Sequence, residues 1–211
     1  MQSEALSAAP FPVRRDLIEN FERTWANLAG PGARWTGAER IAVADEARRA
    51  RSEDSPGTVL PEVGAKAVRL LASDPAAARR SWLEGLRAAG LDQERYVELL
   101  GVVARLVAVD TFYEALGLSP APLPDPVAGE PTGEVSVQAR PGKGWVPMVG
   151  GTSITQALSL IPSENAELER FHGAMYLTFK QMSDPTVTRG LTRPQMELVA
   201  ARTSAVNECF Y

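Results

Sequence analysis

The chain has 211 residues, 45% of them hydrophobic, and a formal net charge of −4 from 22 basic and 26 acidic side chains. This allows a sizeable core, in one domain or two small ones, and argues against nucleic acid as a partner. A single cysteine and a single histidine exclude a disulfide framework, a multi-cysteine zinc site and a His-rich metal site. With no apolar run of about 20 residues and no secretory signal pattern, we expect a cytoplasmic protein with a reduced thiol, no membrane partner and no cofactor.

Apolar periodicity predicts helices through the first half of the chain, after a loose Ala/Pro/Ser-rich stretch at 1–13. The expected ranges are 15–29, 36–52, 60–72, 75–89 and 92–116. The second begins with the capping box Thr36-x-x-Glu39, in which each side chain satisfies a backbone amide of the other residue. The last has apolar residues around most of its circumference, so we expect it to be buried.

Residues 117–151 differ in composition, with seven prolines and seven glycines. We expect a long surface loop, and loops of this length are usually functional or wrap a neighbouring structure. Its Trp145-Val-Pro-Met148 tract is expected to pack on the core or over a pocket. The loop separates an N-terminal helical half, residues 1–116, from a C-terminal helical half, residues 152–211.

In the C-terminal half, helices are expected at 153–160 and 166–182, and a further helix starts at Thr192. This start is strongly specified, because Thr192 and Gln195 form a second capping box and Pro194 lies in the first turn. The fold class predicted from these elements is all-α, a helical bundle. Two explanations of the repeated capping box stay open: a shared pattern of helix starts, or two degenerate copies of one helical half.

The only cysteine, Cys209, lies in the closing run 205–211. On a straight helix Glu197 and Cys209 would lie about 18 Å apart along the axis and could not cooperate. A break at Asn207-Glu208 would let Cys209 open a new helix and turn back toward the carboxylate, because Asn tolerates the left-handed conformation and caps helices. A helix N-terminus at Cys209 would also favour the thiolate.

The string Glu197-Leu-x5-Ser204-Ala205-x-Asn207-x-Cys209 resembles the segment leading into the active site of the alkylhydroperoxidase D and carboxymuconolactone decarboxylase-like superfamily. The superfamily pattern is Glu, eleven residues, Cys, two residues, Cys, three residues, His. Weaker similarity covers 96–118 and 145–148. The resemblance implies an alkylhydroperoxidase D-like all-α homo-oligomer that reduces hydroperoxides as a peroxidase, with a thiol protein or a small thiol as reductant.

In that superfamily the second cysteine attacks the peroxide, the first resolves the sulfenic acid as a disulfide, and Glu and His relay protons. The resemblance therefore implies that Cys209 is the resolving thiol and Glu197 the relay carboxylate. Tyr211 falls where some members have a relay histidine, and a phenol is a poor base near pH 7. The attacking residue would be position 212 and a second relay histidine position 216.

The printed chain thus matches only the first half of the redox motif, and we expect it to have little or no peroxidase turnover. One hypothesis is that codon 212 is UGA and encodes selenocysteine, which the nucleotide sequence after codon 211 tests. The alternatives are a catalytically inactive helical oligomer or ligand-binding module, and a cofactor-free decarboxylase. We also expect uncovered apolar side chains at Val199, Val206 and Phe210, and a satisfied core or interface histidine at His172.

Overall fold

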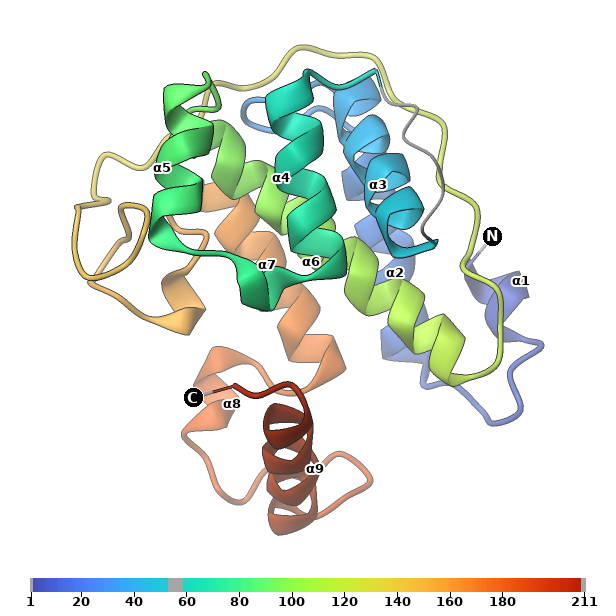
Figure 1. Cartoon of the computed structure of the whole chain (residues 1–211). Coiled ribbons are helices and arrows are strands. Elements are labelled where there is room, and N and C mark those ends of the chain that lie inside the picture. Colours follow the sequence, from blue (N-terminus) through green and yellow to red (C-terminus); the bar gives the residue numbers. More distant parts are fainter. Residues whose placement is uncertain (1, 53–58, 210–211) are drawn as a thin grey trace.

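The computed structural model describes residues 2–52 and 59–209, and within these ranges the chain is helical, with no strand (Figure 1). The helices are α1 Gln2–Leu6, α2 Arg15–Ala29, α3 Gly37–Ser52, α4 Glu62–Ser73, η1 Pro75–Ala77, α5 Arg80–Ala88, α6 Gln93–Ala115, η2 Ile154–Gln156, α7 Pro162–Met175, α8 Phe179–Met182 and α9 Arg193–Val206. The all-α prediction is confirmed.

The first half follows the predicted pattern closely, with two differences. Residues 2–6 form the short α1 within the stretch expected to be loose. The helix predicted over 75–89 is instead the 3-10 turn η1 followed by α5. The interruption lies at Ala78 and Arg79, which are extended, and the Arg79 guanidinium bonds the carbonyls of Ala76 and Ala78. An arginine that donates hydrogen bonds to the free carbonyls at the end of a turn favours the end of the turn at that point.

Two predictions in the second half are wrong. The helix expected over 153–160 is only the turn η2, because Ser153 and Ser159 hydrogen-bond to nearby backbone groups and compete with helix formation. The helix expected over 166–182 starts earlier, at Pro162, and is divided into α7 and α8. The division lies at Tyr176, and Thr178 then caps α8 in a capping box of its own.

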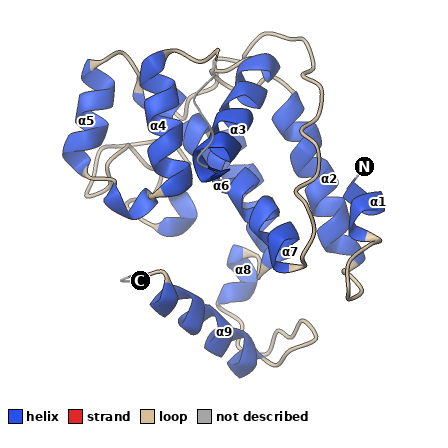
Figure 2. Cartoon of the chain, turned by 45° about the vertical axis from the view of Figure 1, so that its right-hand side comes forward, coloured by secondary structure: helices blue, strands red, loops and turns tan. Residues whose placement is uncertain are grey.

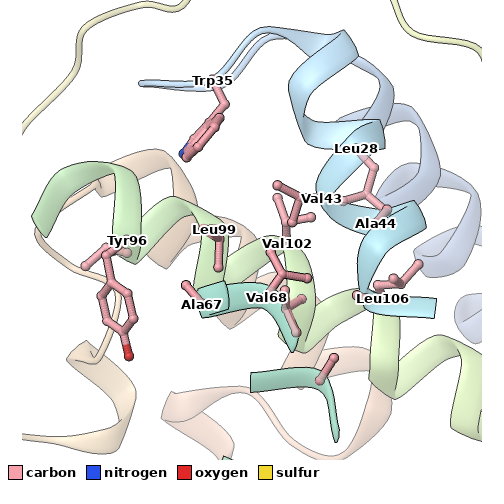
Figure 3. Packing of buried hydrophobic residues seen from close by; sticks show 14 of the residues in the cluster. Leu28, Trp35, Val43, Ala44, Ala67, Val68, Tyr96, Leu99, Val102 and Leu106 are labelled. Carbon is pink, nitrogen blue, oxygen red and sulfur yellow. The ribbon is translucent and has the colours of Figure 1, made fainter. Parts of the chain in front are cut away.

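Helix α6 is the centre of the bundle and is packed by α3, α4 and α7. Its Leu99, Val102 and Leu106 lie against Val68 of α4 and Val43 of α3 (Figure 3), and all five are buried. A helix with neighbours on several sides needs apolar residues around most of its circumference, as the sequence of α6 indicates.

The Pro/Gly-rich loop wraps the bundle as a long connection, as expected (Figure 1). It pairs with the end of α2 through a backbone hydrogen bond from Val127 N to Ala29 O at 2.8 Å. Two more bonds, from Thr132 N to Gly32 O and from Gly133 N to Ala33 O, each at 2.9 Å, join it to the segment between α2 and α3. Further along, the 145–148 tract packs partly on the core, with Val146 buried and Trp145 at the surface.

A network of charged side chains lies inside the bundle. Arg40 Nη1 lies 2.5 Å from Glu98 Oε1 and 2.9 Å from Glu164 Oε1, and Arg105 Nη2 lies 2.7 Å from Glu164 Oε2. Asn27 Oδ1 accepts hydrogen bonds from both guanidinium groups. Each of the four charged side chains is at most 3% exposed. The network is electrically neutral and joins α2, α3, α6 and α7.

The backbone around this buried charge network leaves room for its carboxylates. A Cβ at Gly32 would lie 1.8 Å from Glu98 Oε1, and one at Gly101 would lie 2.3 Å from Glu164 Oε2. Burial raises the pKa of Glu98, and Arg40 opposes that increase. Burial lowers the pKa of Arg40, but the nearby Glu164 and Glu98 raise it by more. The net pKa is therefore above its ordinary value, and the guanidinium stays protonated.

Removing the central guanidinium should destabilise the fold strongly. Arg40→Met keeps a long apolar stem but leaves Glu98 and Glu164 buried without their shared cation, and we expect a loss of about 3–5 kcal/mol in the free energy of unfolding. Arg49→Met in the same helix is the matched control, because Arg49 pairs with Asp45 at the surface and should cost less than about 1 kcal/mol. Urea unfolding measures both, and equal losses would contradict the structural role of the network.

Two buried tyrosines should ionise at a higher pH than tyrosines in the unfolded chain. Burial raises the pKa of Tyr96 to about 12, and burial together with Asp110 and Glu22 raises the pKa of Tyr113 to about 12. In the unfolded chain these phenols ionise near pH 10, so their contribution to stability is present below pH 10 and is lost as the pH rises toward 12. Ultraviolet titration should show Tyr96 and Tyr113 ionising near pH 12, and Tyr96→Phe should remove one of these two transitions.

Candidate functional site

The C-terminal segment, residues 176–209, extends away from the bundle and carries the predicted site (Figures 1 and 2). Of the 14 residues of α9, only Met196 is buried. Leu198, Val199 and Val206 are 71%, 58% and 68% exposed, so the expectation of uncovered apolar side chains is confirmed for the two valines. Phe210 lies outside the described residues.

Glu197 is held by two donors that converge on one of its oxygens. The Tyr176 hydroxyl and the Arg193 Nε both donate to Glu197 Oε1 at 2.5 Å. The hydrogen bond from Tyr176 and then the bond from Arg193 lower the pKa of Glu197. Partial burial and the contact with Glu197 raise the pKa of Tyr176. The site therefore keeps an ionised carboxylate beside a neutral phenol.

Arg193 also fixes α9 to α8. Its guanidinium donates to three carbonyls at the end of α8, namely Gln181 O at 3.2 Å, Met182 O at 2.9 Å and Asp184 O at 2.9 Å. Gln181 O also accepts from the Asp184 N–H at 3.0 Å, and a cation placed at carbonyls at the end of a helix favours the helix C-terminus. Glu197 supplies the counter-charge from one turn along α9.

His172 lies beside this cluster in a defined orientation. Its Nδ1 is 2.6 Å from the Leu177 carbonyl oxygen, and because a carbonyl can only accept, Nδ1 carries the proton. In the neutral imidazole Nε2 is then the basic nitrogen. The ring meets Tyr176 edge to face at 5.7 Å and Phe179 at 5.5 Å between centroids. The expected satisfied histidine is thus found, half-buried.

The helix break predicted before Cys209 is confirmed. Helix α9 ends at Val206, Asn207 is its C-cap, and Glu208 adopts a left-handed conformation with φ of 53°. The Cys209 N–H then donates to Ser204 O at 2.9 Å, which closes the turn. The thiol is exposed, with Sγ 3.8 Å from Asn207 O.

The structure does not place Glu197 beside Cys209. The stretch of helix from Glu197 to Val206 corresponds to about 14 Å of axial rise, and each side chain uses the partners described above. Cys209 follows the C-terminal end of α9, and the new helix predicted to start at the cysteine would lie outside the described residues. The role predicted for Tyr211 falls outside the described residues.

Sequence reasoning missed the two partners of Glu197. Arg193 had a detectable signal, because it lies four residues before Glu197 on a predicted helix. Tyr176 had none, because its contact across 21 residues depends on the division between α7 and α8. The buried charge network was missed as well, although Glu98 lies within the helix expected to be buried.

Over residues 2–52 and 59–209, no group of three or more His, Cys, Asp or Glu side chains is arranged to hold a metal ion. Within the same ranges, no helix has the length and apolar character needed to span a bilayer. Comparison of the chain with protein-family models, with curated proteins and with solved structures finds no match.

Acid should weaken the attachment of the C-terminal segment. Because the pKa of Glu197 is lowered in the folded chain, its contribution to stability is complete above the ordinary value of 4.5 and is lost as the pH falls through the folded pKa. Tyr176→Phe removes the hydrogen bond that lowers the pKa of Glu197 most, so it should raise that pKa. A carbon-13 NMR titration of the Glu197 carboxyl measures it. Tyr96→Phe is the control, and an equal pKa in all three proteins would contradict the assignment.

Proposed function

We propose that the protein is a thiol- or selenol-dependent peroxidase that reduces hydroperoxides, with Cys209 as the resolving thiol of a CxxC-type centre. The observation that carries this proposal is the break after Val206, which falls where the Glu-to-Cys motif requires the chain to leave the helix. The thiol at the break is exposed, as a thiol that exchanges with an external reductant must be.

In the proposed reaction, a thiolate or selenolate at position 212 attacks the terminal oxygen of a hydroperoxide. A sulfur–oxygen or selenium–oxygen bond forms, the oxygen–oxygen bond breaks, and the alkoxide leaves and takes up a proton as an alcohol. Cys209 then attacks the oxidised centre, forming a disulfide or selenenyl sulfide and releasing water. Two exchange steps with a thiol reductant restore the pair and oxidise the reductant to its own disulfide.

Glu197 serves this scheme as a carboxylate that stays ionised near neutral pH, with Tyr176 as the attached proton donor. For Glu197 to accept a proton from the reacting centre, the chain after Cys209 has to turn back along α9. A positioned acid–base group of this kind contributes roughly a hundredfold or more to a rate. Tyr211 is proposed to donate a hydrogen bond there in place of a relay histidine.

Adding one cysteine after Tyr211 tests the proposal, because it creates the pair Cys209-x-x-Cys. With a dithiol reductant, we expect the extended chain to turn over hydroperoxide and the 211-residue chain to show little or no turnover. Before reductant is added, one equivalent of hydroperoxide should give the disulfide in the extended chain, whereas Cys209→Ser should leave the added cysteine as a sulfenic acid. Glu197→Gln should slow turnover by roughly a hundredfold, and Glu208→Gln is the matched control and should have little effect. A folded but inactive extended chain, or oxidation that gives no disulfide to Cys209, would refute the proposal.

A second candidate function is a catalytically inactive helical oligomer or ligand-binding module. The exposed Leu198, Val199 and Val206 favour it, because a helix with uncovered aliphatic residues is suited to association. The proposed homo-oligomer is common to both functions, so only the turnover measurement separates them. A lactone-specific activity that does not depend on Cys209 would favour a decarboxylase instead.

A further inference from the structure

A second region of interest lies at the start of α6, outside the C-terminal segment. The start of α6, the segment joining α2 to α3 and the long loop surround a cleft of about 360 Å³. Its lining residues are Ala33, Arg34, Asp92, Arg95, Pro131 and Gly133. The backbone bonds from Thr132 and Gly133 to Gly32 and Ala33 fix its two walls against each other, so the cleft is preformed.

Two arginines line this cleft without a carboxylate partner. Among the described residues, neither Arg34 nor Arg95 takes part in a salt bridge, and the buried Arg34 Nε has no hydrogen-bond acceptor. Arg40 and Arg105 also leave buried nitrogen atoms without an acceptor, but both guanidinium groups are paired with Glu164. Two guanidinium groups that line one cleft without a carboxylate partner leave their positive charge available to a ligand of opposite charge.

Both arginines are held in place by the fold. The Arg34 N–H donates to Glu98 Oε2 at 2.6 Å, which fixes its backbone to the buried charge network. The Arg95 guanidinium lies 5.1 Å above the ring of Trp35, and the Trp35 Nε1–H donates to Arg95 O at 3.0 Å. Figure 3 shows Trp35 at the edge of the core beneath the ribbon of its loop. Arginines restrained in this way lose little freedom when they bind an anion.

One acidic residue lies in the same cleft. Asp92 is the N-cap of α6, and its Oδ1 accepts from the Arg95 N–H at 2.7 Å. The cleft therefore holds two positive charges and one negative charge, at the end of a 23-residue helix whose dipole adds positive potential. The balance favours an anion, and Asp92 reduces the affinity for it.

We propose that this cleft binds the phosphate group of a small phosphorylated molecule. Arginine guanidinium groups match phosphate oxygens in pairs, and a helix N-terminus favours the same charge. The volume is within the range of small-molecule sites and exceeds what a single ion needs. This inference is independent of the proposed peroxidase function, because it uses none of the residues of the C-terminal segment.

The test is an NMR titration of the full chain with inorganic phosphate at constant ionic strength. We expect saturable shifts at the Nε–H groups of Arg34 and Arg95. Either Arg34→Gln or Arg95→Gln should weaken binding by about tenfold or more, since each removes a charged hydrogen-bonding group. Arg87→Gln is the matched control, because Arg87 is an exposed arginine on the neighbouring α5, and it should leave the affinity unchanged.

Asp92→Asn provides a test in the opposite direction. Asn caps helices as well as Asp, so folding is retained while the opposing charge is removed, and phosphate affinity should rise severalfold. A gain in affinity cannot result from misfolding. The site would be overturned if sodium chloride produced the same shifts as phosphate, or if the Arg34 and Arg95 variants bound phosphate as tightly as the unsubstituted chain. It would also be overturned if Asp92→Asn gave no gain in phosphate affinity. Tighter binding of acetate than of phosphate would overturn the choice of ligand.

Discussion

The pairing of Arg40 with Glu98 and Glu164 is the interaction on which the arrangement of the helices depends. Charges buried this deeply are tolerated only when the geometry is good and every group is compensated, since removing one partner leaves the others uncompensated. Here the partners come from α3, α6 and α7, with Asn27 of α2 bonded to the same guanidinium. Apolar packing alone would allow these helices to shift, whereas the charge pairs fix their relative positions.

Both proposed sites depend on the positions that this network sets. Glu98 uses its second oxygen to hold the backbone of Arg34, and so places one wall of the arginine-lined cleft. Glu164 lies in the first turn of α7, and the far end of the same helix leads into Tyr176, the partner of Glu197. The cleft and the C-terminal segment are therefore both attached to helices that this charge network joins.

The features that could be predicted from the sequence are those set by residues close together in the chain. The ends of α2 and the break at Asn207-Glu208 were both readable, because stop residues and capping residues act within a few positions. The charge network was not readable in the same way, since Arg40, Glu98 and Glu164 are 58 or more positions apart and each resembles a solvated charge. The signal that existed was Glu98, a carboxylate between apolar neighbours in a helix expected to be buried. The helix expected over 153–160 failed because serine side chains satisfied the backbone locally instead.

Helix α9 is stabilised in a different way from the rest of the fold. A 14-residue helix is marginal alone, and with only Met196 buried α9 gains little from packing. Its stability comes from polar groups: Gln195 accepts from the Thr192 N–H, and Arg193 links Glu197 to the carbonyls at the end of α8. Polar links orient a helix but leave its aliphatic side chains in water. A peroxidase centre built on α9 needs shelter from water to keep its intermediate, so the proposed second copy, packed over Leu198, Val199 and Val206, would complete the site as well as the fold.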